Sequence, residues 1–80
     1  MQDKIAVVGQ GYVGLPLAIS AANAGFRVIG LDNNGNKVGN LNNFISDIEG
    51  IGSDELKKII SKGNYFATDD FSKLADVDII

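Results

Sequence analysis

The sequence predicts an α/β domain built on a parallel β-sheet. Short apolar runs alternate along the chain with longer stretches of helical character, and glycine, asparagine or aspartate marks each change. Uninterrupted apolar runs are typical of strands buried on both faces. Strands that alternate with helices favour a parallel sheet joined by right-handed crossovers. A chain of 80 residues is long enough for one small domain with a thin core.

The first three elements are a strand, a helix and a strand. Residues 4–9, KIAVVG, are predicted as the first strand. Residues 13–24 are rich in Ala and Leu and are predicted as a helix, because Pro16 near their start is tolerated in a first helical turn. Gly25 is expected to end this helix. Residues 27–32, RVIGLD, form a second buried strand that ends in an acid.

Two helices are expected before the next strand. Asn33 or Asn34 is expected to cap the first of them, whose apolar face would combine Val38, Leu41 and Ile45. A loop is predicted at residues 46–52. Ser53 is expected to cap the second helix, and Lys62 and Gly63 to close it. The buried stripe of this helix is Leu56, Ile59 and Ile60.

The last elements are two short strands with a brief helix between them. Residues 65–68, YFAT, are predicted as the third strand. Asp69 or Asp70 would cap a short helix that carries Phe71 and Leu74, and residues 77–80, VDII, open a fourth strand. The expected spatial order of the strands is 3-2-1-4. Because the chain stops within an apolar strand, we interpret it as a truncated fragment of a larger domain.

Composition excludes several classes of function. The net charge is −3 and the seven basic residues are scattered, which argues against a nucleic-acid partner. The chain contains no cysteine and no histidine, so no metal site is expected and a Cys or His nucleophile is excluded within it. The N-terminus lacks the apolar core of a signal peptide, and no stretch is typical of a membrane span. We therefore expect a cytoplasmic protein.

Three glycines lie at the predicted turn from the first strand to the first helix. Gly9 permits a tight turn, Gly11 lets a phosphate approach the backbone, and Gly14 lets the helix pack close to the strand. A phosphate there would meet free N–H groups and the positive end of the helix dipole. The backbone N–H groups of Tyr12 and Val13 are therefore candidate ligands. The Tyr12 side chain either lines the pocket or packs inside.

An acid at the end of the second strand completes the pattern. Asp32 lies 18 residues after Gly14, near the spacing of about 20 at which an acid bonds the adenosine ribose. Its alternative role is that of a helix cap. Asn33 beside it belongs to the same candidate site, and Lys37 either leans toward the adenosine or lies in solvent. The features together predict a Rossmann-like, NAD-binding domain, with residues 1–80 as its N-terminal part.

The runs GQGYVGLPLA and GLDNNGNKVGNLN resemble the UDP-glucose/GDP-mannose dehydrogenase family. The resemblance implies an NAD-dependent enzyme that oxidises the C6 hydroxyl of a nucleotide sugar to a carboxylate, in two hydride transfers, for surface polysaccharide synthesis. The family's catalytic cysteine, lysine, asparagine and aspartate have no counterpart here, so no catalytic residue is expected within residues 1–80. A UDP-sugar substrate would bind through a C-terminal part that these residues lack, in a homo-oligomeric full-length protein. The cofactor-side residues that carry over are Gly9, Gly11, Tyr12, Val13, Gly14, Asp32 and Lys37.

The sugar and two alternative functions remain open at this point. Residues 46–49 resemble the UDP-N-acetylhexosamine dehydrogenases more than the UDP-glucose enzymes, by Ser46, Ile48 and Glu49. Gly50 and Gly52 after them, and Gln10 in the glycine turn, depart from both groups of enzymes. One alternative is a non-catalytic NAD-sensing domain of a potassium-transport regulator. The long connection at residues 33–64 disfavours it. The other is a β-hydroxyacid-type dehydrogenase.

Overall fold

A computed structural model describes residues 4–74 and 78–79. Its elements, in chain order, are β1 (Lys4–Val8), α1 (Gly14–Asn23), β2 (Arg27–Leu31), α2 (Gly35–Asn42), α3 (Ser53–Ser61), β3 (Tyr65–Thr68), the 3₁₀ helix η1 (Phe71–Leu74) and β4 (Asp78–Ile79). Residues 77 and 80 of the expected fourth strand lie outside the described residues. The predicted fold class, a Rossmann-like α/β domain, is confirmed.

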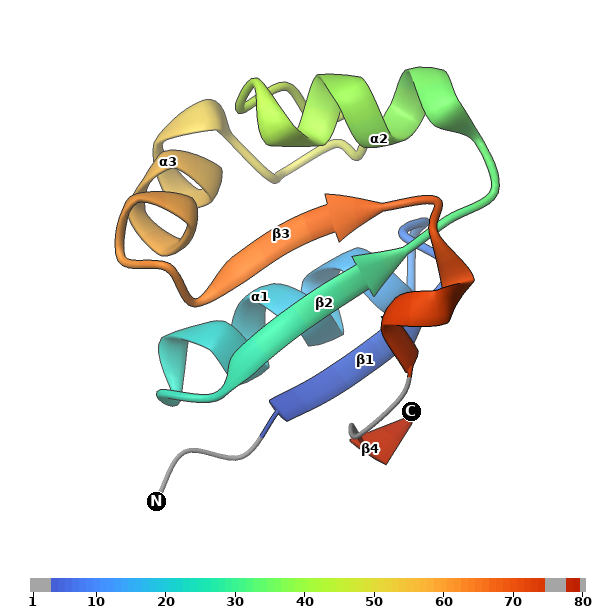
Figure 1. The fold of residues 1–80 in the computed structure, drawn as a ribbon. Helices are drawn as coiled ribbons and strands as arrows, with labels where there is room; N and C mark the ends of the chain where they lie inside the picture. The colour runs from blue at the N-terminus through green and yellow to red at the C-terminus, as the bar shows by residue number, and fades with distance from the viewer. Residues whose placement is uncertain (1–3, 75–77, 80) are drawn as a thin grey trace.

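The strands form one parallel sheet in the order β3-β2-β1-β4 (Figure 1). β1 and β2 pair in register from Lys4 opposite Arg27 to Val8 opposite Leu31. β3 joins the outer side of β2, while β4 lies on the other side of β1. The chain therefore steps outward from β1 to β3 and then returns past β1. In open α/β sheets, the carboxyl end of the strands at such a reversal is where ligands bind.

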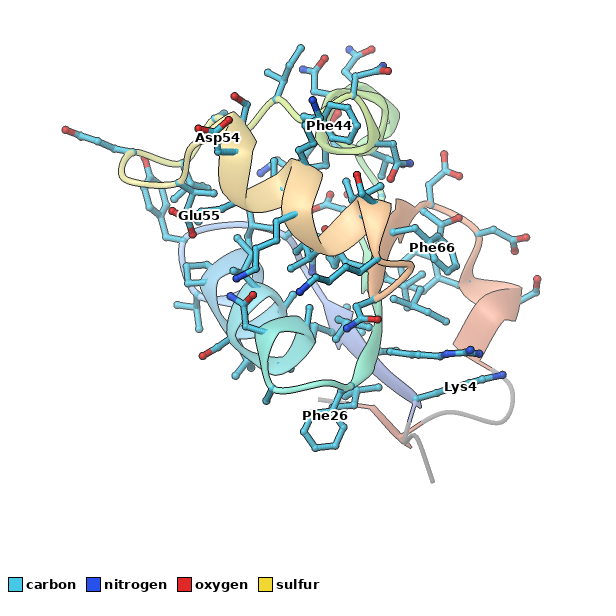
Figure 2. All side chains as sticks on the ribbon, turned by 90° about the vertical axis from the view of Figure 1, so that its left-hand side faces the viewer. Lys4, Phe26, Phe44, Asp54, Glu55 and Phe66 are labelled. Atoms are coloured by element: carbon cyan, nitrogen blue, oxygen red, sulfur yellow. The ribbon has the colours of Figure 1, made fainter. Side chains whose placement is uncertain are left out.

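One face of the sheet is covered by α1 and α3, and η1 lies on the opposite face (Figure 1). Side chains of the sheet, among them Val7 and Val28, pack with Leu15, Leu56 and Ile59 of the two helices. Alternation along the strands sends other side chains to the opposite face. Phe66 of β3 points there, away from α1 and α3, and is 43% exposed (Figure 2).

Glycines end two helices, as the sequence predicts. Gly25 after α1 and Gly63 after α3 have φ angles of 104° and 76°. This left-handed backbone is accessible to glycine at little cost, which is why glycine commonly follows a helix. Of the two candidates for the cap of α2, Asn34 takes the role: its side chain accepts a hydrogen bond from the Lys37 backbone N–H at 3.1 Å.

Two expectations about helix ends are wrong. Helix α2 ends at Asn42, so Ile45 is not on its apolar face and is 54% exposed. The backbone turns at Phe44, whose φ is 67°, and the Ile45 N–H donates to the Asn40 carbonyl in a C-terminal cap. The N-cap of α3 is Gly52 rather than Ser53, because Gly52 already has the extended backbone of a cap and Ser53 is helical.

Helix α2 runs beside β3 (Figure 1). The side chain of Asn42 donates to the Ala67 carbonyl at 2.8 Å and accepts from the Ala67 N–H at 2.9 Å. These bonds satisfy backbone groups of β3 that β2 does not reach. Among the described helices, none is both long and apolar enough to cross a membrane.

Candidate functional site

The turn between β1 and α1 has the backbone geometry that its glycines allow. Gly9 has a φ of 86°, and its N–H donates to the Leu31 carbonyl of β2 at 2.6 Å. A Cβ atom added at Gly14 would overlap the Gly9 carbonyl oxygen, so only glycine fits where α1 begins. Gly9 and Gly14 are therefore required by the fold itself.

Gly11 has a different environment. A Cβ atom added there would meet nothing within 4 Å, and its φ lies outside the left-handed range. The protein therefore does not need glycine at this position for its own packing. The absence of a side chain keeps the backbone approachable from outside, as a bound pyrophosphate requires.

Gly11 begins a run of four backbone N–H groups without a protein acceptor among the described residues. Within the described part of the chain, the N–H groups of residues 11–14 have no protein acceptor, since α1 begins here and Val13 provides no side-chain cap. They lie at the positive end of the α1 dipole, which favours an anion. Tyr12 and Val13 are 78% and 82% exposed. The expectation that Tyr12 packs inside is thus excluded in this structure.

A hollow of about 400 Å³ opens beside this turn, at the carboxyl end of β1. Gly9, Gly11 and Gly14 form part of its wall, with apolar side chains supplying the rest. The apolar lining residues are Val7, Val8, Val13 and Leu17. Because β4 lies on the other side of β1, the hollow is at the point where the strand order reverses.

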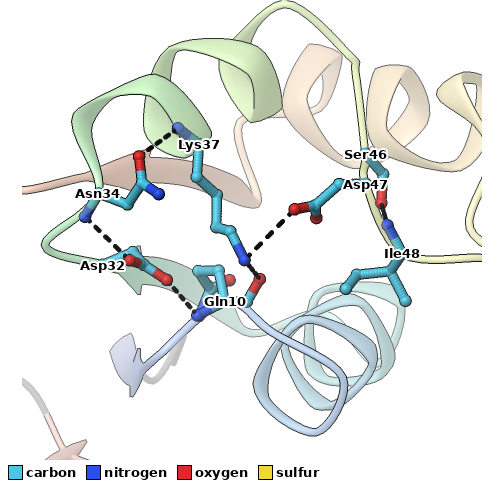
Figure 3. Close-up of polar contacts among 7 residues, drawn as sticks. All are labelled: Gln10, Asp32, Asn34, Lys37, Ser46, Asp47 and Ile48. Atoms are coloured by element: carbon cyan, nitrogen blue, oxygen red, sulfur yellow. Dashed lines mark hydrogen bonds and ion pairs between the residues drawn. The ribbon is translucent and has the colours of Figure 1, made fainter.

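Asp32 follows the last residue of β2 and is held by backbone donors on both carboxylate oxygens (Figure 3). Its Oδ2 accepts from the Gln10 N–H at 2.9 Å, and its Oδ1 accepts from the Asn34 N–H at 3.0 Å. Burial alone would raise the pKa of this carboxyl. The two hydrogen bonds and the charge of Lys37 outweigh burial, so the pKa is lowered from its ordinary value. Asp32 is therefore an ionised, oriented acceptor beside the glycine turn.

Lys37 leans toward the glycine turn and is not an ordinary solvated lysine. Its Nζ donates to the Gln10 carbonyl at 3.4 Å and lies 3.6 Å from Asp47 Oδ2 in the α2–α3 loop (Figure 3). Its side chain is only 20% exposed. Asn33, by contrast, is exposed next to Asp32 and makes no contact that identifies a role.

Gln10 and Tyr65 are the residues of this region that sequence reasoning missed. Gln10 is fully buried, and its side chain accepts a hydrogen bond from the Tyr65 hydroxyl at 2.8 Å. The unusual glutamine in the glycine turn was the available signal. Its partner lies 55 positions away, and no local pattern connects the two. Among the described residues, no group of three or more His, Cys, Asp or Glu side chains is placed to hold a metal ion.

The sequence matches the model of the UDP-glucose/GDP-mannose dehydrogenase family, NAD binding domain, over residues 3–80. The chain belongs to this family. The domain that matches is the one that binds NAD, and the geometry fits that cofactor: an open glycine turn, unpaired N–H groups and an oriented carboxylate lie together. No comparison supports the potassium-transport sensor or the β-hydroxyacid dehydrogenase.

Three similar proteins illustrate the relationship. A UDP-N-acetyl-D-mannosamine dehydrogenase from Yersinia pestis is 33% identical over 78 residues, covering 98% of this chain and 19% of the relative. The structure of the UDP-N-acetyl-mannosamine dehydrogenase from Pyrococcus horikoshii superposes with a TM-score of 0.87 at 33% identity, covering 96% of this chain and 19% of that one. GDP-mannose dehydrogenase from Pseudomonas aeruginosa gives a TM-score of 0.83 at 32% identity, covering 95% and 19%. The chain thus spans less than a fifth of the length of each relative.

Proposed function

We propose that this chain supplies the pyrophosphate- and adenosine-binding part of an NAD-dependent nucleotide-sugar 6-dehydrogenase. The observation that carries the proposal is the open turn at Gly11 beside the ionised carboxylate of Asp32. Family membership supplies the reaction class. NAD, when bound, supplies the acceptor for the hydride that leaves the sugar.

The roles of the residues follow from their positions. Gly11 would let the pyrophosphate reach the backbone, where the N–H groups of Tyr12 and Val13 donate to it. Asp32 would accept hydrogen bonds from the adenosine ribose hydroxyls. Asn33 borders this ribose position. Lys37 donates a hydrogen bond to the Gln10 carbonyl, and its charge stabilises the ionised form of Asp32.

The groups that act on the sugar are proposed to lie outside these residues. The chain contains no cysteine to form a thiol-bound intermediate. It therefore binds and orients the cofactor, while further parts of a longer protein would bind the UDP-sugar and perform the oxidation. A cytoplasmic location, a homo-oligomeric assembly and a role in polysaccharide synthesis belong to the same proposal.

The proposed sugar is a UDP-N-acetylhexosamine, with UDP-glucose as the alternative. Several relatives are named UDP-N-acetyl-D-mannosamine dehydrogenases, including the Y. pestis protein and one from P. horikoshii. In the loop that resembles those enzymes, the Ser46 hydroxyl accepts from the Ile48 N–H at 3.0 Å, which fixes the backbone ahead of Glu49.

A titration with NAD followed by NMR tests the cofactor site. The amide signals of residues 9–15 and 32–33 should move first. The dissociation constant should be about 1 mM or higher, equivalent to about −4 kcal/mol, because the chain spans less than a fifth of the length of its relatives. Shifts that begin elsewhere, with these amides unmoved, would refute the site.

Turnover is tested separately. The pure 80-residue chain should produce no NADH from UDP-N-acetylmannosamine, UDP-N-acetylglucosamine or UDP-glucose. Detectable NADH from any of them would show that catalytic groups are present within these residues.

A further inference from the structure

A buried hydrogen-bond network lies directly beneath the glycine turn. Gln10 has an exposed fraction of 0%, although it lies in the turn itself. Its Nε2 donates to the Val7 carbonyl at 2.9 Å and to the Gly9 carbonyl at 3.1 Å. Its Oε1 accepts from the Tyr65 hydroxyl at 2.8 Å. Both polar atoms of the side chain are therefore satisfied inside the protein.

Tyr65 reaches the turn from the outer strand β3, across β2. It begins β3, is 2% exposed, and packs in the core beside Val28 of the intervening strand. The two side chains meet over Gly30 of β2. A Cβ atom added at Gly30 would overlap both Gln10 Oε1 and the Tyr65 hydroxyl. The absence of a side chain at Gly30 of β2 thus provides the space in which Tyr65 of β3 and Gln10 of the glycine turn meet.

The backbone of Gln10 faces the candidate nucleotide site. Its N–H donates to Asp32 Oδ2 at 2.9 Å, and its carbonyl accepts from Lys37 Nζ at 3.4 Å (Figure 3). The same residue therefore anchors the turn through its side chain and orients the proposed ribose acceptor through its backbone. Any shift of the side chain would displace the peptide that holds Asp32.

We propose that Tyr65 is a positioning residue of the nucleotide site, which acts through Gln10 to hold the glycine turn in its binding conformation. The inference rests on the proposed site. A turn that is already ordered loses less conformational entropy when a ligand binds, so the network raises affinity without touching the cofactor. The Tyr65 hydroxyl remains a donor throughout the ordinary pH range, because burial and the charge of Asp32 both raise its pKa.

Tyr65→Phe is the direct test, because phenylalanine keeps the ring and removes only the hydroxyl. In the protein without NAD, hydrogen exchange of the Gln10 amide should become about tenfold faster relative to the amides of β2. The dissociation constant for NAD should rise about tenfold, since a buried acceptor loses its donor. Unchanged exchange at Gln10 together with an unchanged dissociation constant would overturn the inference.

Asn64→Ala is the matched control. Asn64 precedes Tyr65, and its side chain donates to the Ala22 carbonyl near the end of α1, at 3.2 Å. This bond also joins the start of β3 to another element, but it lies at the end of the sheet remote from the turn. The variant should lower the free energy of unfolding and leave both Gln10 exchange and NAD affinity unchanged. A loss of NAD affinity equal to that of Tyr65→Phe would mean that general stability is responsible, and would overturn the inference.

Gln10→Met supplies the second arm. It removes this bond from the turn side with a side chain of similar length, together with the two bonds from Nε2 to the Val7 and Gly9 carbonyls, so it should weaken NAD binding by at least about tenfold. In this background, Tyr65→Phe should change the dissociation constant less than about twofold, because Tyr65 acts on the turn through its bond to Gln10, which is already absent. Additive losses would overturn the inference, as would unaltered affinity in Gln10→Met. If the unmodified protein binds no NAD, the proposed function fails, and the exchange rate at Gln10 still decides whether Tyr65 holds the turn.

Discussion

The side chain of Asn42 pairs with Ala67 as a neighbouring β-strand would. One donor and one acceptor of its amide meet the carbonyl and the N–H of the same residue, at 2.8 and 2.9 Å. The pairing occupies the outer edge of β3, the last strand on that side of the sheet. Unpaired edges promote association between sheets, so this contact protects the edge as well as fixing α2.

Replacement of Asn42 by alanine should therefore destabilise the fold. Both Ala67 groups lose a partner, and the expected cost is about 1–3 kcal/mol in the free energy of unfolding measured with urea. Asn43→Ala is the control, since the Asn43 side chain donates only to the exposed Gly39 carbonyl of its own helix. Equal losses of unfolding free energy in the two variants would show that the contact with β3 stabilises the fold no more than an exposed hydrogen bond does.

Substitution can distinguish the roles of Gly11 and Gly14 in the turn. Gly11→Ala should fold with unchanged stability, because its Cβ meets no protein atom, but should weaken NAD binding several-fold. Gly14→Ala should destabilise the fold, because its Cβ overlaps the Gly9 carbonyl oxygen. Thermal unfolding and NAD titration distinguish the two effects. Unweakened NAD binding by Gly11→Ala would remove the argument that Gly11 serves the ligand.

Gly39→Ala is the control for these two variants. Gly39 lies within α2, and a Cβ atom there also meets nothing within 4 Å. The substitution should raise the free energy of unfolding by about 0.5–1 kcal/mol, because alanine loses less backbone entropy in a helix. It should leave NAD affinity unaltered.

Asp32 should make the protein prefer NAD over NADP. The 2′-phosphate of NADP would place like charge against the carboxylate; two unit charges 4 Å apart repel by roughly 4 kcal/mol at an effective dielectric of 20, before salt screening. A preference of at least about tenfold requires only about 1.4 kcal/mol. Asp32→Ala should weaken NAD binding and reduce the difference between the affinities for NAD and NADP, as titration with each cofactor would show. Equal affinities of the unmodified protein would leave Asp32 as a structural acceptor only.

The lowered pKa of Asp32 predicts a loss of stability in acid. The folded state favours the charged form, so the contribution is present above the ordinary pKa of 3.8 and disappears as the pH falls through the lower folded value. Asp32→Asn should remove this part of the pH dependence. Denaturant unfolding between roughly pH 6 and pH 2.5 measures it. If the free energy of unfolding of the unmodified protein and of Asp32→Asn changed with pH in the same way, the lowered pKa of Asp32 would be contradicted.

Local patterns predicted the elements whose determinants are close in sequence. The glycine turn, the strand that leads into Asp32 and the end of α1 before Gly25 follow from the chain's own backbone preferences. The early end of α2 was missed because Phe44 adopts a left-handed backbone in which glycine is usual. The pattern of apolar residues in a helix gives no signal that a non-glycine residue will adopt this conformation.

The missed part of the site depends on contacts between distant segments. Gln10 in isolation looks like a polar turn residue, and Tyr65 looks like the first residue of an apolar strand. Their bond exists because Gly30 leaves space between them, and that requires β1, β2 and β3 to be assembled. The orientation of Lys37 has the same origin, since its acceptor lies 27 positions earlier in the chain.

The central place of β1 has a consequence for the order in which the protein folds. β1 is made before the other described strands, yet it pairs on both sides, with β2 and with β4. Its pairing with β2 needs only one helical crossover, whereas Ile5 meets Asp78 across almost the whole chain. Closing that larger loop costs more entropy and comes late. During synthesis, one edge of β1 therefore stays open until β4 has been made, and a nascent chain is most exposed to mispairing there.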